Sequence, residues 1–145
     1  MDSKEFLSQG DKVYEAKKSL TRQIEYCNAE IGNLRSVDYS KEYVTGTRDN
    51  SNSKDGKLIL IREDCKFKLN ELTLKDIEYQ QQVQDCLSKM PEGNPRRALL
   101  HYHVFGQSQR EIGRQWGYDH KQIQRFLQKG YEEFPMPENP IEFNL

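Results

Sequence analysis

The stretch QREIGRQWGYDHKQIQRFLQK (109–129) contains the pattern from which the fold can be inferred. Its apolar residues recur at helical spacing, but Gly117 interrupts them and Asp119 precedes a second helical run. The stretch therefore predicts a helix over about 109–116, a turn, and a second helix over 119–130.

Residue type and spacing within this stretch favour a helix-turn-helix over an ordinary helical corner. Gly113 is small where the first helix would meet the second, and Gly117 tolerates the positive φ of a tight turn. Ile123 then anchors the second helix. We expect the following apolar side chains to be buried: Ile112, Trp116, Ile123, Phe126 and Leu127.

Two capping signals mark the starts of these helices. Ser108 is followed three residues later by Glu111, which is the spacing of a capping box. Asp119 has Gln122 in the matching position. We therefore expect both side chains to cap their helices.

The second helix presents polar side chains on the face opposite Ile123 and Phe126. Gln and Arg pair with base edges in the major groove, while Lys and Arg neutralise phosphate. The candidate DNA-reading residues are His120, Lys121, Gln124, Arg125 and Gln128. Flanking residues suited to contacts with the DNA backbone are Arg110, Arg114 and Lys129.

The charge distribution agrees with a nucleic-acid partner. Residues 96–130 hold seven Lys or Arg against two acids, which gives +5, although the whole chain has a net charge of −1. Residues 1–95 carry 15 bases and 17 acids, and residues 131–145 carry four acids and no base. A basic block in an otherwise acidic chain is typical of an electrostatic binding surface.

Apolar seams in the first two thirds of the chain predict a long helical pair. One seam runs on an N-terminal helix (1–37) through Leu20, Ile24, Cys27, Ile31 and Leu34. The other runs on a long second helix (57–90) through Cys65, Leu69, Leu72, Asp76, Tyr79, Val83, Cys86 and Met90. Leu58 and Ile61 extend it, and Leu74 and Ile77 widen it around the polar Asp76.

Residues 38–56 are rich in Gly, Ser, Asn and Asp and predict a flexible connector. We therefore expect an all-α protein, with a two-helix coiled-coil hairpin followed by a helix-turn-helix domain (95–134). The seams leave open whether the hairpin forms within one chain or between two, as a homodimer. The last segment, 135–145, is acidic and proline-rich and predicts a loose tail.

The segment PRRALLHYHVFGQSQREIGRQWGYDHKQIQRFLQKGYEEF (95–134) resembles the DNA-binding region 4 of bacterial sigma factors. The residues that match are Arg97, Gly106, Ser108, Glu111, Ile112, Gly113 and Gly117. With the helical pair before it, the chain is similar to late-transcription regulators of the RinA and ArpU type from Gram-positive phages. The resemblance implies a DNA-binding protein that switches on late genes, with RNA polymerase as a further partner.

Two other functions fit the same pattern. The helix-turn-helix could bind RNA polymerase or another host protein, or it could belong to a DNA-packaging recognition subunit. An enzyme is not expected, because the sequence has no nucleophile elbow, phosphate-binding loop or zinc-protease motif. His101 and His103 are two residues apart and point to different sides of a helix, so we expect no metal or cofactor.

The cysteines and the lack of long apolar runs indicate where in the cell the protein acts. Three cysteines far apart, Cys27, Cys65 and Cys86, suggest buried thiols rather than a disulfide framework. No apolar run is long enough to span a membrane, and the first residues lack a signal core. We therefore expect double-stranded DNA as partner, no membrane association and a cytoplasmic location in a bacterial cell.

Overall fold

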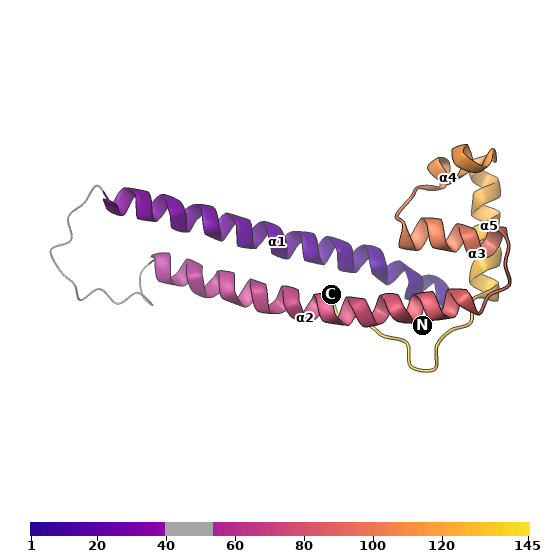
Figure 1. The fold of residues 1–145 in the computed structure, drawn as a ribbon, viewed down its shortest axis with the longest axis horizontal. Coiled ribbons are helices and arrows are strands. Elements are labelled where there is room, and N and C mark those ends of the chain that lie inside the picture. Colours follow the sequence, from indigo (N-terminus) through magenta and orange to yellow (C-terminus); the bar gives the residue numbers. More distant parts are fainter. Residues whose placement is uncertain (40–53) are drawn as a thin grey trace. The chain divides into compact units, whose positions relative to one another are not determined.

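The computed structural model describes residues 1–39 and 54–145, and the side chains of 1–32 and 54–145. The described residues are all-helical, which confirms the predicted class, and begin with a pair of long helices (Figure 1). The elements are α1 (Ser3–Tyr39), α2 (Lys54–Ser88), α3 (Asn94–Leu99), the π-helix η1 (Leu100–Val104), α4 (Gln109–Trp116) and α5 (His120–Glu133). Most of the predicted connector, 40–53, lies outside the described residues.

Both long helices differ slightly from their predicted bounds. α1 begins after Asp2, whose carboxylate Oδ1 accepts a hydrogen bond of 2.8 Å from the backbone N–H of Glu5. This side-chain acceptor satisfies one of the N–H groups that a helix start leaves unpaired. α2 ends at Ser88, just before the turn that contains Pro91.

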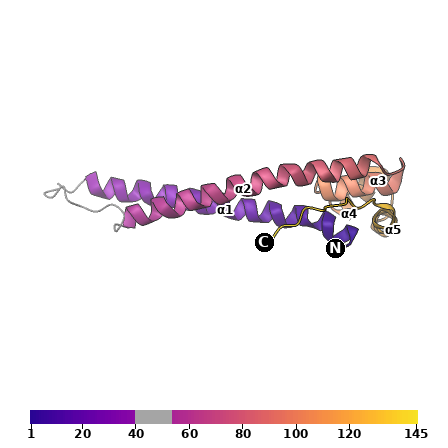
Figure 2. The same ribbon diagram turned by 90° about the horizontal axis from the view of Figure 1, so that it is seen from below.

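Residues 15–74 form one compact unit, in which α1 and α2 lie side by side and antiparallel (Figures 1 and 2). Cys27, Ile31 and Cys65 are buried there. Arg62 donates from Nη1 to Asn28 Oδ1 at 2.9 Å, a bond between the two helices. The hairpin therefore forms within one chain in this unit, and all three cysteines of the protein are free thiols.

The apolar face of α2 is narrower than predicted. Leu74 is 67% exposed, Ile77 is 56% exposed and Ile61 is 50% exposed, so the expectation that they belong to the seam is wrong. Leu74 is two residues from the seam residue Leu72, and two residues correspond to about 200° around a helix. Ile77 has the same relation to Tyr79, so both side chains point away from α1.

A second compact unit comprises residues 1–14 and 75–145. It therefore contains the predicted domain 95–134 together with the first turns of α1 and the last turns of α2. Its core is one cluster of buried side chains, to which every helical element of the unit except η1 contributes. The largest fully buried members are Phe6, Leu7, Tyr79, Leu99, Ile112 and Ile123.

The segment after α5 is irregular, as predicted, but it is not loose. Phe134 is only 6% exposed, and the side chains of Met136, Ile141 and Phe143 pack against the core cluster. The expectation failed because the tail binds to residues distant in sequence, in α1 and α2. None of the helices described in residues 1–39 and 54–145 has the length and apolar character to cross a membrane.

Candidate nucleic-acid interface

The junction between α4 and α5 is built as its glycines suggest. Ser108 caps α4, because its Oγ accepts a hydrogen bond from the Glu111 N–H at 3.1 Å. α4 ends at Trp116, and its C-cap Gly117 has φ = 77°, in the left-handed region that favours glycine. The Tyr118 N–H then donates to the Gly113 carbonyl at 2.8 Å and closes the turn.

Gly113 sets how closely α4 approaches the segment that follows it. A Cβ at this position would lie 2.6 Å from the carbonyl oxygen of Tyr118 and 3.6 Å from Cγ1 of Ile123. Ile112 and Ile123 are both 0% exposed, so α4 and α5 meet through buried apolar side chains. This packing fixes the direction in which the outer faces of both helices point.

Asp119 stands at the N-cap of α5, but its side chain makes no capping hydrogen bond, so that prediction is wrong. Its carboxylate lies instead 3.0 Å from Nδ1 of the exposed His120. The start of α5 is stabilised by the backbone, because the Gln122 N–H donates to the Asp119 carbonyl at 3.0 Å. The Asp119 carboxylate therefore contacts the imidazole of His120 and not the free N–H groups at the start of α5.

All the predicted DNA-contact residues are exposed and belong to the same compact unit. Lys121 and Arg125 stand two residues before and after the buried Ile123, about 200° around α5 from the core. Arg110 and Arg114 are related in the same way to Ile112 on α4. These four cations therefore point outward from adjacent helices.

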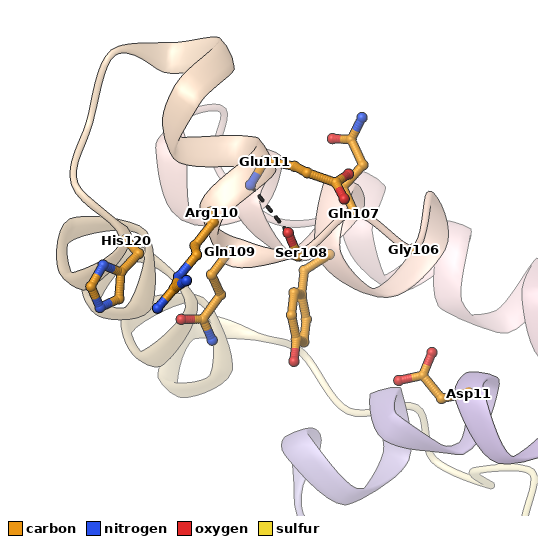
Figure 3. A pocket seen from close by; sticks show the side chains of 9 residues that line it. Asp11, Gly106, Gln107, Ser108, Gln109, Arg110, Glu111 and His120 are labelled. Atoms are coloured by element: carbon orange, nitrogen blue, oxygen red, sulfur yellow. Dashed lines mark hydrogen bonds between the residues drawn. The ribbon is translucent and has the colours of Figure 1, made fainter.

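Three of the other predicted residues of α5, His120, Gln124 and Gln128, line cavities beside the helix. A cavity of about 500 Å³ contains His120 together with Arg110 from α4 and Asp11 from α1. Figure 3 shows Asp11 on one side of this cavity and His120, Arg110 and Gln109 on the other. A second cavity, of about 160 Å³, is lined by Lys4, Ser8, Asp11, Tyr102, Gln109, Gln124, Leu127, Gln128 and Tyr131.

The contribution of α1 to this surface was missed from the sequence. Lys4, Ser8 and Asp11 line the cavity that also contains Gln124 and Gln128, more than 100 residues later in the chain. The Ser3 hydroxyl donates to the Tyr131 carbonyl at 2.7 Å and holds the first turn of α1 against α5. A periodicity search cannot find this contact, because its partners belong to different helices.

A run of aromatic rings connects η1, α4 and α5 with the loops after η1 and α4. Trp116 is half-buried rather than fully buried as expected, and Arg97 lies over its ring at 4.7 Å. The ring of His101 is 5.4 Å from that of Trp116 and 5.2 Å from that of Phe105. The run continues through Phe126 to Tyr118. Trp116 thus combines core packing with a cation–π contact at the surface.

His103 on η1 is partly buried and hydrogen-bonded to another titratable group. Its Nε2 lies 2.7 Å from the Tyr131 hydroxyl, and burial lowers the pKa of His103 to about 4. Burial also raises the pKa of Tyr131 to about 12. Both groups are therefore neutral near pH 7, and their hydrogen bond joins η1 to α5.

The described residues contain no group of three His, Cys, Asp or Glu side chains placed to hold a metal ion. Comparisons of the chain with known protein families, curated proteins and solved structures found no match. The resemblance to sigma-factor region 4 therefore depends on the residues quoted from the sequence.

Proposed function

We propose that this protein is a sequence-specific DNA-binding regulator of transcription and that α4 and α5 act as its helix-turn-helix. The observation that carries the proposal is the outward position of Lys121 and Arg125 on α5, next to Arg110 and Arg114 on α4. Four exposed cations on two adjacent helices form a basic surface of the kind that nucleic-acid-binding proteins use.

In this proposal α5 enters the major groove. Arg125 and Gln124 are long enough to form paired hydrogen bonds with base edges, and Gln128 lies one turn further along the helix. Arg110, Arg114, Lys121 and Lys129 contact phosphates. His120, at the start of α5, adds a further phosphate contact.

The biological role rests on the resemblance to sigma-factor region 4 and to phage late-transcription regulators. The short αL turn at Gly117 and the close approach at Gly113 support the helix-turn-helix assignment. Activation of late phage or mobile-element genes is the role that the resemblance implies.

The test is fluorescence anisotropy with labelled fragments from the source genome, at low and at near-physiological salt. The wild-type chain should retain one fragment at the higher salt, and Lys121→Ala/Arg125→Ala should lose it. A matched control, Arg22→Ala/Lys57→Ala, removes two exposed cations from residues 15–74 and should retain it. If every fragment bound weakly at low salt and none bound at the higher salt, the basic face would attract DNA only through non-specific electrostatic attraction, and the proposal of sequence-specific binding would be wrong.

A second candidate is a protein-interaction module that binds RNA polymerase or another host protein. The observation that favours it is the aromatic run, whose ends Phe105 and Tyr118 are 57% and 45% exposed. Exposed aromatic side chains are enriched at protein interfaces, as is arginine, and Arg97 lies over Trp116 in the same run. Activity that survives Lys121→Ala/Arg125→Ala but is lost in Phe105→Ala would favour this function.

A homodimer remains part of the proposal. The seam residues already pair α1 with α2 within residues 15–74, so a dimer would need another face. Leu60, Phe67 and Leu74 are exposed on α2 and are spaced by seven residues, the period at which one helix meets another.

A further inference from the structure

The segment after α5 is held by two glutamine side chains that bind its backbone. Gln9 of α1 donates from Nε2 to the Ile141 carbonyl at 2.9 Å and accepts from the Phe143 N–H at 3.0 Å. Gln82 of α2 donates to the Asn139 carbonyl at 2.7 Å and accepts from the Ile141 N–H at 3.0 Å. Each amide therefore makes a paired contact of the kind that a neighbouring β-strand would make.

The two glutamine side chains bind backbone groups of the tail at every second residue. The bonded positions are 139, 141 and 143, which is the period of an extended chain. Gln9 is only 7% exposed, so its amide is committed to the tail and to the Phe6 carbonyl. A peptide in this place needs an extended backbone, and the glutamines do not distinguish its side chains.

Side-chain selectivity comes from an aromatic socket around Phe143. Its ring lies 5.4 Å from the ring of Tyr79, edge to face, and Lys75 Nζ lies 5.0 Å from its centroid. Tyr79 is fixed in turn, because its hydroxyl donates to the Phe6 carbonyl at 2.7 Å. Such a socket favours an aromatic residue, with an apolar residue such as Ile141 two positions before it.

The tail does not fill the space at this end of the unit. A cavity of about 400 Å³ lies beside Glu142 and Phe143 and is lined on the α1 side by Lys4, Glu5, Ser8, Gln9 and Lys12. The charged side chains around this cavity are two lysines, Lys4 and Lys12, and two glutamates, Glu5 and Glu142, so their charges balance. A larger segment could use this free space to make contacts that residues 141–143 do not make.

We propose that Gln9, Gln82 and the Tyr79–Lys75 socket form a binding groove for an extended peptide with the pattern apolar-x-aromatic, supplied by a partner protein. Residues 139–143 occupy the groove within the chain and compete with that partner. Because a tethered segment has an effective concentration in the millimolar range, a partner must offer more contacts than the tail, and the cavity beside Phe143 provides them. The cavity beside Phe143 shares Lys4 and Ser8 with the cavity that Gln124 and Gln128 line.

The test uses the full chain and a fluorescent peptide with the sequence FPMPENPIEFNL (134–145). Phe143→Ala weakens the resident tail without changing the groove. We expect this variant to bind the peptide at least tenfold more tightly than the wild-type chain in an anisotropy titration. Adding Gln82→Ala should abolish the gain.

A matched control peptide carries N-methyl groups on the residues that correspond to Ile141 and Phe143. It keeps every side chain but lacks the two N–H groups that the glutamines accept, so it should not bind. Equal binding of the two peptides, or no gain from Phe143→Ala in a chain with wild-type circular dichroism, would overturn the proposal. If Phe143→Ala does not fold, Phe143→Leu, which keeps an apolar side chain, serves for the same comparison.

Discussion

Gly113 is the single position at which the α4–α5 junction depends on the absence of a side chain. A Cβ there would meet the Tyr118 carbonyl oxygen at 2.6 Å, and a backbone atom cannot rotate out of the way. Gly113→Ala must therefore move α4 away from the turn. We expect a loss of about 1–3 kcal/mol in the free energy of unfolding, which is typical of overpacking.

Urea unfolding followed by circular dichroism measures this loss. Gly32→Ala is the matched control, because that glycine is helical and exposed and a Cβ there meets nothing within 4 Å. It should stabilise the chain by up to about 1 kcal/mol, since alanine favours helix over glycine. If the two variants were equally stable, the close approach at Gly113 would not exist in solution.

Asp11 is an acidic residue that the structure places beside the proposed DNA-contact residues, although it is distant from them in the sequence. Its exposed carboxylate lines both cavities beside α5, one with Arg110 and His120 and the other with Gln124. A negative charge at this position repels the phosphates that the cations attract. We expect Asp11→Asn to raise DNA affinity several-fold at low salt, with a smaller gain at higher salt because the repulsion is screened.

Anisotropy titrations with one DNA fragment at two salt concentrations test this prediction. Glu15→Gln is the control, because it removes an exposed carboxylate one turn further along α1 and outside both cavities. An unchanged affinity in Asp11→Asn would place the DNA elsewhere. A wild-type chain without DNA binding would instead contradict the proposed function itself.

Among the elements, η1 gives the unit a predicted sensitivity to acid. The pKa of His103 falls from 6.5 to about 4 because burial disfavours the charged ring. In the unfolded chain the ring takes up a proton as the pH drops below 6.5, whereas the folded ring stays neutral to about pH 4. Stability is therefore full above pH 6.5 and is lost between these two values.

Urea unfolding at several pH values from 7 to 4 is the measurement. Within this window His103 should raise the unfolding equilibrium constant by up to about tenfold per pH unit. His103→Gln, which has no titratable ring, should show a smaller slope than the wild-type chain. The same slope in both chains would assign the acid sensitivity to other groups.

The elements also show what a sequence can predict. α4, Gly117 and α5 could be located because their signals are local: a cap, a turn glycine and apolar residues at helical spacing. The docked tail could not be predicted, because it depends on contacts between residues distant in the chain. Gln9 and Gln82 bind residues more than 50 positions away, and no periodicity indicates such pairs.

For the molecule as a whole, the pairing of α1 with α2 restricts how two chains could associate. Cys27, Ile31 and Cys65 are buried within residues 15–74, so a dimer through the same seam would have to separate the two helices. The face with Leu60, Phe67 and Leu74 remains, and each of these side chains is at least 61% exposed. A dimer of this kind would present two copies of α5, as binding to a palindromic site requires.

Sedimentation equilibrium measures this association. We expect the wild-type chain to shift from monomer to dimer as its concentration rises, and Phe67→Lys to remain monomeric because it places a charge in the apolar stripe. Tyr26→Lys alters a side chain of similar exposure, 62%, on α1 and should leave the shift unchanged. A wild-type chain that stays monomeric would contradict the homodimer, and a Phe67→Lys chain that dimerises normally would assign the contact to another face. If Phe67→Lys also lost DNA binding at higher salt while keeping weak binding at low salt, two half-sites would be required for specific recognition.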